Sequence, residues 1–216
     1  MREAESGRER PLRFPDVRPP RPLLDPASES RLTARQRQVL EELEEILAVD
    51  RLGSLTMAEI AARLNCSLRT LYGISPSKEE LVLAVVDRRL RRIGRAAMEP
   101  LRSSMSPLEA LRAYLRAVNE AVQPAAVAYA RELAGIPGAD RLLDAHEGYV
   151  VAVARSLLDR AVQEGEIPRV DTAAVAHVLG RLGREFARPD LADIAGPSPK
   201  ATADALADII LRGLRP

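Results

Sequence analysis

The sequence predicts an all-α protein in which an N-terminal three-helix module is joined to a larger C-terminal helical bundle, with about nine helices in total. Three observations support this fold class. Apolar residues make up 46% of the chain, dominated by Ala, Leu and Val, whereas aromatic residues make up only 3%. Apolar positions recur at helical spacing in successive segments. No segment alternates apolar and polar residues convincingly enough to predict a strand.

The charge is nearly balanced, with 32 basic and 31 acidic residues among 216. A protein that coats nucleic acid without selectivity is more basic, because phosphate neutralisation supplies that affinity. Any contact with DNA is therefore expected to be local and shared between two copies of the chain. No apolar run reaches the roughly 20 residues that span a bilayer, and the N-terminus lacks an apolar signal segment. We expect a soluble, cytoplasmic protein without a membrane partner.

Residues 1–31 contain six of the sixteen prolines and few large apolar residues. This composition predicts a disordered tail. The tail is either simply solvated or acts as a flexible basic arm that touches phosphates or a minor groove. The second interpretation would involve the arginines of the tail, which are Arg8, Arg10, Arg13, Arg18 and Arg21.

A three-helix domain is predicted over residues 32–78. Its first helix, 34–49, opens with a capping box formed by Thr33 and Gln36. Apolar residues then follow at helical spacing, at Val39, Leu40, Leu43, Ile46 and Leu47.

Residues 56–81 predict two short helices, a tight turn between them and the start of a long helix. Thr56 and Glu59 form a capping box, and Asn65 is suited to the left-handed conformation that ends a helix. Ser67 is a good N-cap for a second short helix over 68–72. This order is a helix-turn-helix, whose second helix can enter the major groove of DNA.

Residues 79–216 are predicted to form the larger bundle. A third capping box, at Ser77 and Glu80, opens a helix that runs from 78 to about 98. Proline and glycine breaks then separate the periodic segments. The predicted helices are 107–122, 125–133, 139–164, 171–186 and 203–214.

The helix-turn-helix region resembles the TetR family of transcriptional regulators over residues 33–82. The resemblance rests on helix 34–49, the cap at Thr56, the Ile60-Ala61 pair, and the runs Ser67-x-x-Thr70-Leu71-Tyr72 and Ser77-Lys78-Glu79-x-Leu81. The sequence departs from the family where Ile74 and Ser75 replace an aromatic or His followed by Phe, and where Asn65 replaces a small Gly. The lost aromatic pair removes an expected phosphate contact and a plug of the core.

The resemblance implies a homodimer that binds a palindromic operator, with residues 79–216 serving effector binding and dimerisation. The last two helices would form the dimer interface. Arg69 would read a base or remain a solvated or phosphate-bound side chain, Leu68 would meet a thymine methyl or lie in the core, and Tyr72 would contact DNA or be buried. Lys78 would meet a phosphate or be simply solvated. The expected DNA-contacting residues are Ser67, Leu68, Arg69, Thr70, Tyr72, Gly73 and Lys78.

A small-molecule effector is expected to bind polar and aromatic residues within the otherwise apolar C-terminal helices. The candidates are Asn119, Gln123, Tyr129, Arg131, Glu132, His146, Tyr149 and His177. Each of these residues has an ordinary alternative, as an exposed or packing side chain. Cys66 is expected to be a small core residue.

The sequence contains no phosphate-binding glycine loop, nucleophile elbow or metal-ligand spacing, so we expect no enzyme, cofactor or metal site. The function predicted is a ligand-responsive DNA-binding regulator, a repressor that leaves its operator when the effector binds. The alternative is a helical ligand-binding or scaffold protein whose helix-turn-helix no longer binds DNA.

Overall fold

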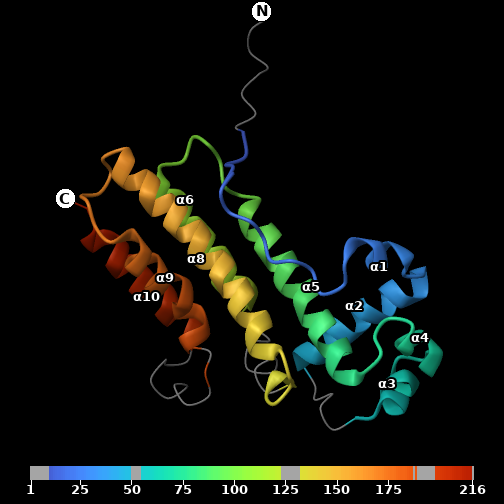
Figure 1. Ribbon diagram of the computed structural model, residues 1–216. Helices are drawn as coiled ribbons and strands as arrows, with labels where there is room; N and C mark the ends of the chain where they lie inside the picture. Colours follow the sequence, from blue (N-terminus) through green and yellow to red (C-terminus); the bar gives the residue numbers. More distant parts are fainter. Residues whose placement is uncertain (1–9, 50–54, 123–131, 187, 189–197, 216) are drawn as a thin grey trace, which may run out of the picture.

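The computed structural model describes residues 10–49, 55–122, 132–186, 188 and 198–215. These residues form nine helices and one isolated antiparallel bridge between Pro11 and Arg102, which confirms the all-α prediction. The helices are α1 (Pro26–Arg31), α2 (Ala34–Val49), α3 (Met57–Arg63), α4 (Leu68–Tyr72), α5 (Lys78–Met98), α6 (Pro107–Val122), α8 (Ala139–Gln163), α9 (Thr172–Phe186) and α10 (Pro199–Gly213). Figure 1 shows α1–α4 gathered beside one end of α5, and α6, α8, α9 and α10 packed along the rest of the bundle.

The helix boundaries of the module follow its capping residues. Thr56 and Glu59 form a reciprocal capping box at the start of α3. Asn65 ends this helix with φ of +46°, in the left-handed region that Asn tolerates better than most residues. Ser67 and Ser77 cap α4 and α5 through bonds from the amides of Thr70 and Glu80. These predicted caps are all present.

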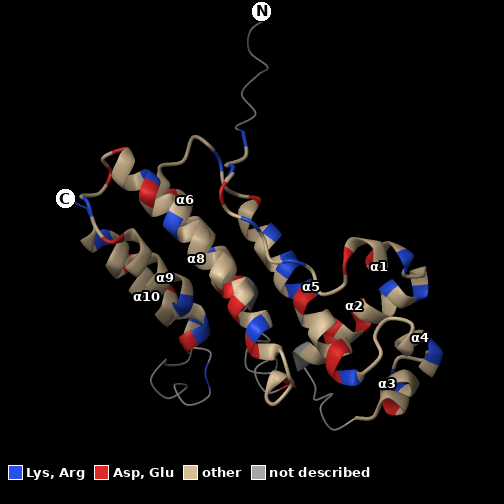
Figure 2. Ribbon diagram, in the orientation of Figure 1, with Lys and Arg blue, Asp and Glu red and all other residues tan. Residues whose placement is uncertain are grey.

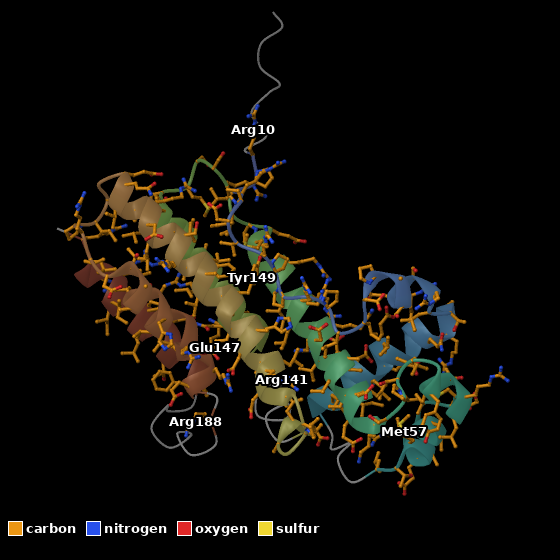
Figure 3. All side chains as sticks on the ribbon, viewed as in Figure 1. Arg10, Met57, Arg141, Glu147, Tyr149 and Arg188 are labelled. Atoms are coloured by element: carbon orange, nitrogen blue, oxygen red, sulfur yellow. The ribbon has the colours of Figure 1, made fainter. Side chains whose placement is uncertain are left out.

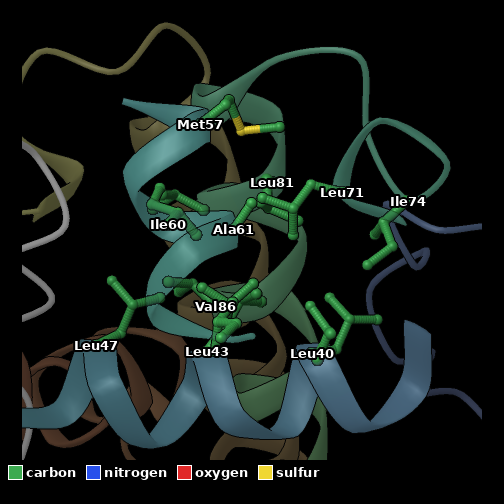
Figure 4. Packing of buried hydrophobic residues seen from close by; sticks show 14 of the residues in the cluster. Leu40, Leu43, Leu47, Met57, Ile60, Ala61, Leu71, Ile74, Leu81 and Val86 are labelled. Carbon is green, nitrogen blue, oxygen red and sulfur yellow. The ribbon is translucent and has the colours of Figure 1, made fainter. Parts of the chain in front are cut away.

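A first hydrophobic core joins α2, α3 and α4 to the beginning of α5 and to the beginning of α8 (Figure 4). Leu43, Ile60 and Leu71 are fully buried in it. Ile74 is buried in the same core, and Ser75 is buried beside it. Ile74 thus supplies an apolar contact at one of the two positions where the family's aromatic pair was expected.

A second hydrophobic core holds α6, α8, α9 and α10 together with the end of α5. Leu111, Leu157 and Leu158 are completely buried at its centre. Two helices connect the module to the bundle: α5 contributes Leu81 to the first core and Ala97 to the second, and α8 contributes Leu142 to the first and Leu157 to the second. No helix among the described residues combines the length and the apolar character needed to span a bilayer.

The described part of the N-terminal segment, residues 10–31, differs from the expected disordered tail. The amide of Leu12 donates to the carbonyl of Leu101 (3.1 Å), and the amide of Ser103 donates to the carbonyl of Arg10 (2.9 Å). Proline fixes an extended backbone without needing helical periodicity, and a few apolar side chains then reach the cores. Those side chains are Leu12, Phe14, Val17 and Leu24.

One further helix and one helix boundary differ from the prediction. Helix α1 was not predicted, and it buries none of its own residues. Helix α10 begins at Pro199 rather than at 203, because Ser198 caps it and proline suits the first helical position. The predicted helix 125–133 falls mostly outside the described residues.

Candidate nucleic-acid interface and ligand cavity

Helix α4 has one buried face and one exposed face. Leu71 is completely buried against the first core, whereas Leu68 is 41% exposed and Tyr72 is 53% exposed. Arg69 is exposed as well. Figure 2 shows α4 at the outer edge of the module, away from the bundle. Of the alternatives drawn from the sequence, burial of Leu68 and Tyr72 is therefore wrong.

Ser67 and Thr70 form a local hydroxyl pair at the start of α4. The Oγ of Ser67 accepts from the amide of Thr70 (3.1 Å) and lies 2.9 Å from the Oγ1 of Thr70. This geometry satisfies one of the orphan amides of the helix N-terminus. Both side chains thus hold α4 in place, and Ser67 remains exposed.

Lys78 lies at the N-terminus of α5, where the helix dipole disfavours a cation. Its Nζ donates to the carbonyl of Leu55 (3.0 Å), in the segment that leads into α3. This bond fastens the beginning of α5 to the beginning of the helix-turn-helix. The structure therefore gives a structural reason for a lysine at this position.

Gly73 leaves room for the side-chain amide of Gln36 beside the end of α4. A Cβ on Gly73 would lie 2.5 Å from the Nε2 of Gln36, which donates to the carbonyl of Thr70 (3.4 Å). Arg35, which sequence reasoning missed, binds the turn before α4 through the carbonyls of Leu64 and Asn65. Two side chains of α2 thus fix both ends of α4.

A cavity of about 820 Å³ lies within the bundle, between α5, α8 and α9. Its wall is mostly apolar and includes Leu90, Ile93 and Val150. The segment 133–138 and one turn of α6 complete the lining. A mostly apolar cavity with few polar groups is the usual form of a site for a small molecule.

Three of the predicted effector residues, Asn119, His146 and Tyr149, line this cavity. His177 does not, because it is exposed on α9 and lies outside the lining. Glu132 is buried next to the lining residue Leu133, and its Oε2 has no hydrogen-bond partner among the described residues. The remaining candidates lie outside the described residues; they are Gln123, Tyr129 and Arg131.

Sequence reasoning missed the charged cluster of the cavity wall. Glu147 is only 8% exposed, and its two oxygens lie 2.6 Å from the Nε of Arg181 and 2.6 Å from the Nη1 of Arg184. Burial lowers the pKa of Arg184, but the bonds to Glu147 and Asp144 outweigh it and the net pKa is raised. Figure 3 shows Glu147 on the side of α8 toward α9, and Tyr149 on the side toward α5. The sequence signal for this charged cluster was the pair Arg181 and Arg184, spaced i, i+3 on α9.

His146 and Asp87 form a buried pair at the edge of the cavity. The Nε2 of His146 lies 2.8 Å from the Oδ1 of Asp87, which is 2% exposed. Asp87 was also not predicted from the sequence, because its partners lie far away in the sequence. Among the described residues, no group of three or more His, Cys, Asp or Glu side chains is arranged to hold a metal ion.

No protein-family model and no curated protein matches the sequence. Solved structures do match it. A TetR transcription regulator from Haloarcula marismortui is 18% identical, with a TM-score of 0.71 over 84% of this chain and 98% of that one. The TetR-family regulator PfmR from Thermus thermophilus is 25% identical, with a TM-score of 0.60 over 83% and 100%. The ketosteroid transcriptional regulator KstR2 of Mycobacterium tuberculosis is 22% identical, with a TM-score of 0.57 over 86% and 97%. The resemblance of residues 33–82 thus extends to most of the chain, which has the fold of the TetR-family transcriptional regulators.

Proposed function

We propose that this protein is a DNA-binding transcriptional regulator that acts as a homodimer and leaves a palindromic operator when a small molecule occupies the cavity. The observation that carries the proposal is the outward face of α4. Leu68, Arg69 and Tyr72 are exposed there, on a short capped helix whose position is fixed by α2. The second helix of a helix-turn-helix inserts such a face into the major groove.

The chemistry of this face suits sequence-specific contact rather than general attraction to phosphate. An arginine can bind a guanine through two hydrogen bonds, and an exposed apolar side chain can meet a thymine methyl group. Tyr72 can donate its hydroxyl to a phosphate oxygen. Because the chain has a formal net charge of only +1, selective contact must supply a larger share of the affinity than in a strongly basic protein.

Dimerisation is proposed to use α9 and α10, which pack against each other at one edge of the bundle (Figure 1). Val178 on α9 is 49% exposed, and Ile209 on α10 is 63% exposed. Ala174 and Ala205 are exposed on the same two helices. A two-fold interface between these faces would present two copies of α4 to half-sites about 34 Å apart, or a multiple of that spacing.

The proposed effector is a small, largely apolar molecule, because the cavity wall is mostly apolar. This molecule would release the protein from its operator only if it binds the DNA-free conformation more tightly than the DNA-bound one. Equal affinity for the two states would shift nothing. Two polar side chains of the wall, His146 and Tyr149, are placed to orient such a ligand.

Fluorescence anisotropy with DNA from upstream of the protein's own gene tests the proposal. We expect specific binding that weakens steeply between about 50 and 200 mM salt. Arg69→Ala should relax discrimination at one base pair by about 1–3 kcal/mol. The matched control is Arg155→Ala, which removes a 59% exposed arginine from α8 and should leave binding unchanged. Absence of salt-dependent binding to any upstream fragment would refute the DNA-binding function.

The alternative function, a helical ligand-binding or scaffold protein without DNA affinity, drew on the near-neutral charge and on Ile74 and Ser75. The burial of both residues within the module weakens the second argument, since the module keeps a packed core. We therefore favour the DNA-binding function.

A further inference from the structure

The N-terminal segment 10–25, here called the strap, connects the two hydrophobic cores along a path separate from α5. At one end it forms the bridge between Pro11 and Arg102, and Phe14 packs against the second core. At the other end the amide of Leu23 donates to the Oδ2 of Asp87 (3.0 Å), and Leu24 packs against the first core. Figure 1 shows this segment running beside α5 and then entering α1.

Asp87 is the residue where the strap and the cavity wall meet. One carboxylate oxygen accepts from the strap amide of Leu23 (3.0 Å), and the other lies 2.8 Å from the Nε2 of His146. A carboxylate that is 2% exposed needs both partners, because an unpaired buried charge is costly. The two contacts therefore share one buried carboxylate, and they link α5 to different parts of the chain.

A ligand in the large cavity can reach this buried pair through His146. The residue lines the large cavity and is otherwise buried, so a molecule that fills the cavity meets it directly. Displacement of the imidazole ring would leave the Oδ1 of Asp87 without its partner. The free-energy cost of this unpaired oxygen would arise at Asp87, the residue that also binds the strap.

A second, smaller cavity of about 190 Å³ adjoins Asp87, and it also contains Glu29 and Glu44, which pair with Arg88 and Arg92. Its lining contains Asp87 itself and four arginines of α5, which are Arg88, Arg91, Arg92 and Arg95. Arg91 donates from Nη1 to the strap carbonyl of Pro20 (3.4 Å). An Asp87 carboxylate that turned toward these arginines would give up the amide of Leu23, and it would compete for the Arg91 contact with Pro20.

We propose that Asp87 couples occupancy of the large cavity to the attachment of the strap, so that a ligand which displaces His146 releases the strap. Release removes the strap's connection between the module and the bundle, and leaves α5 and α8 as the helices that link the two cores. The consequence for DNA rests on the proposed function, because the relative position of module and bundle sets the spacing of the two α4 helices. Asp87 is thus a positioning residue that acts through its two partners.

Hydrogen exchange of the full-length protein, measured by mass spectrometry over peptides from residues 10–25, tests this coupling without any ligand. His146→Leu keeps an apolar side chain but loses the bond to Asp87, and we expect strap exchange to become about tenfold faster. His146→Gln retains a side-chain amide that can reach Asp87, and it should restore exchange to near the wild-type rate. His177→Leu, at an exposed histidine outside the cavity, is the matched control and should change nothing in the strap.

The outcomes separate the coupling from a simple packing effect. Unchanged strap exchange in His146→Leu would overturn the proposal. Equal loosening in the Leu and Gln variants would also overturn it, because packing of the ring would then hold the strap instead of the hydrogen bond. Asp87→Ala should loosen the strap at least as much as His146→Leu. If His146→Leu fails to fold, as judged by circular dichroism, His146→Ala also removes the hydrogen bond to Asp87 and is measured in its place.

Operator binding by the same variants distinguishes this inference from the proposed function. We expect His146→Leu to weaken operator affinity about tenfold and His146→Gln to leave it near wild type. A wild-type protein that binds no DNA, but whose strap exchange responds as expected, would refute the regulator function and support the coupling. A wild-type protein that binds its operator, with strap exchange unaffected by His146→Leu, would refute the coupling alone.

Discussion

Tyr114 lies on α6 with its ring completely buried in the second core. Its hydroxyl has no hydrogen-bond partner among the described residues. Burial raises the pKa of this phenol far above its ordinary value, and the nearby Tyr149 adds to the shift. A buried hydroxyl without a partner costs stability, because it gives up its bonds to water.

Tyr114→Phe is therefore expected to raise the free energy of unfolding by about 1 kcal/mol at neutral pH. The difference in free energy of unfolding between variant and wild type should increase above about pH 10, because there the tyrosine of the unfolded wild type ionises and that of the folded protein stays protonated. The sign follows from the raised pKa, since the stability that depends on the protonated phenol is present below pH 10 and is lost as pH rises. Urea unfolding of both proteins at neutral and alkaline pH measures the difference. A gap that stays constant or narrows with pH would contradict the assignment.

Individual site residues could be predicted only where the local sequence identifies them. Asn119, His146 and Tyr149 stand out as polar or aromatic residues in apolar helices, and all three line the cavity. His177 stands out in the same way but faces outward, because composition does not say which side of α9 a residue occupies. The role of Asp87 could not be predicted, because it comes from hydrogen bonds with Leu23 and His146, which lie 64 and 59 residues away in the sequence.

At the scale of elements, the capping residues predicted helix starts well. Thr33, Thr56, Ser67 and Ser77 all cap the helices expected from them, because a cap depends on neighbours within three residues. The strap was missed because its order comes from separate long-range contacts and not from a periodic pattern. Helix α1 was missed because it buries none of its residues and so carries no apolar stripe.

The pairing of α8 with α9 depends on close approach at Gly180. A Cβ on Gly180 would lie 2.7 Å from the Cγ2 of Val151 and 3.3 Å from the backbone of the same residue. The side chain of Val151 is stiff and backbone cannot move aside, so relief requires the two helices to separate. This glycine therefore fixes the distance between two walls of the large cavity.

Gly180→Ala is expected to lower the free energy of unfolding by about 1–3 kcal/mol, as overpacking in a close helix contact does. Gly213→Ala is the matched control, because nothing lies within 4 Å of a Cβ at that position on α10. The control should be neutral or slightly stabilising, since alanine favours helix over glycine by up to about 1 kcal/mol. Thermal unfolding of both variants provides the comparison. Equal stability of the two variants would show that α8 and α9 do not meet as closely as described.

For the whole molecule, the proposed mechanism joins three surfaces. In that proposal the outward face of α4 would contact DNA, the cavity between α5, α8 and α9 would bind the ligand, and α9 with α10 would contact the second copy. Helix α9 borders both the cavity and the proposed dimer face, through Gly180 on one side and Val178 on the other. A ligand that separates α8 from α9 would therefore also disturb the contact between the two copies.

Substitutions on the proposed dimer face of α9 and α10 test how the two copies meet. Ile209→Glu places a charge at the most exposed large apolar residue described on α10, so it should convert the dimer to a monomer. Operator affinity should then fall by at least about a hundredfold, because a single α4 reads only one half-site. Sedimentation velocity measures the oligomeric state, and anisotropy measures the affinity.

Leu68→Glu provides the contrast, since Leu68 is also an exposed apolar residue but lies on α4. This variant should remain a dimer and still lose operator affinity, because the carboxylate would face the negative DNA surface. If Ile209→Glu instead remained dimeric, the two copies would have to meet elsewhere and the spacing of the two α4 helices would need a different origin. If Leu68→Glu became monomeric, the module itself would form the interface, and α4 could not be the DNA-reading helix.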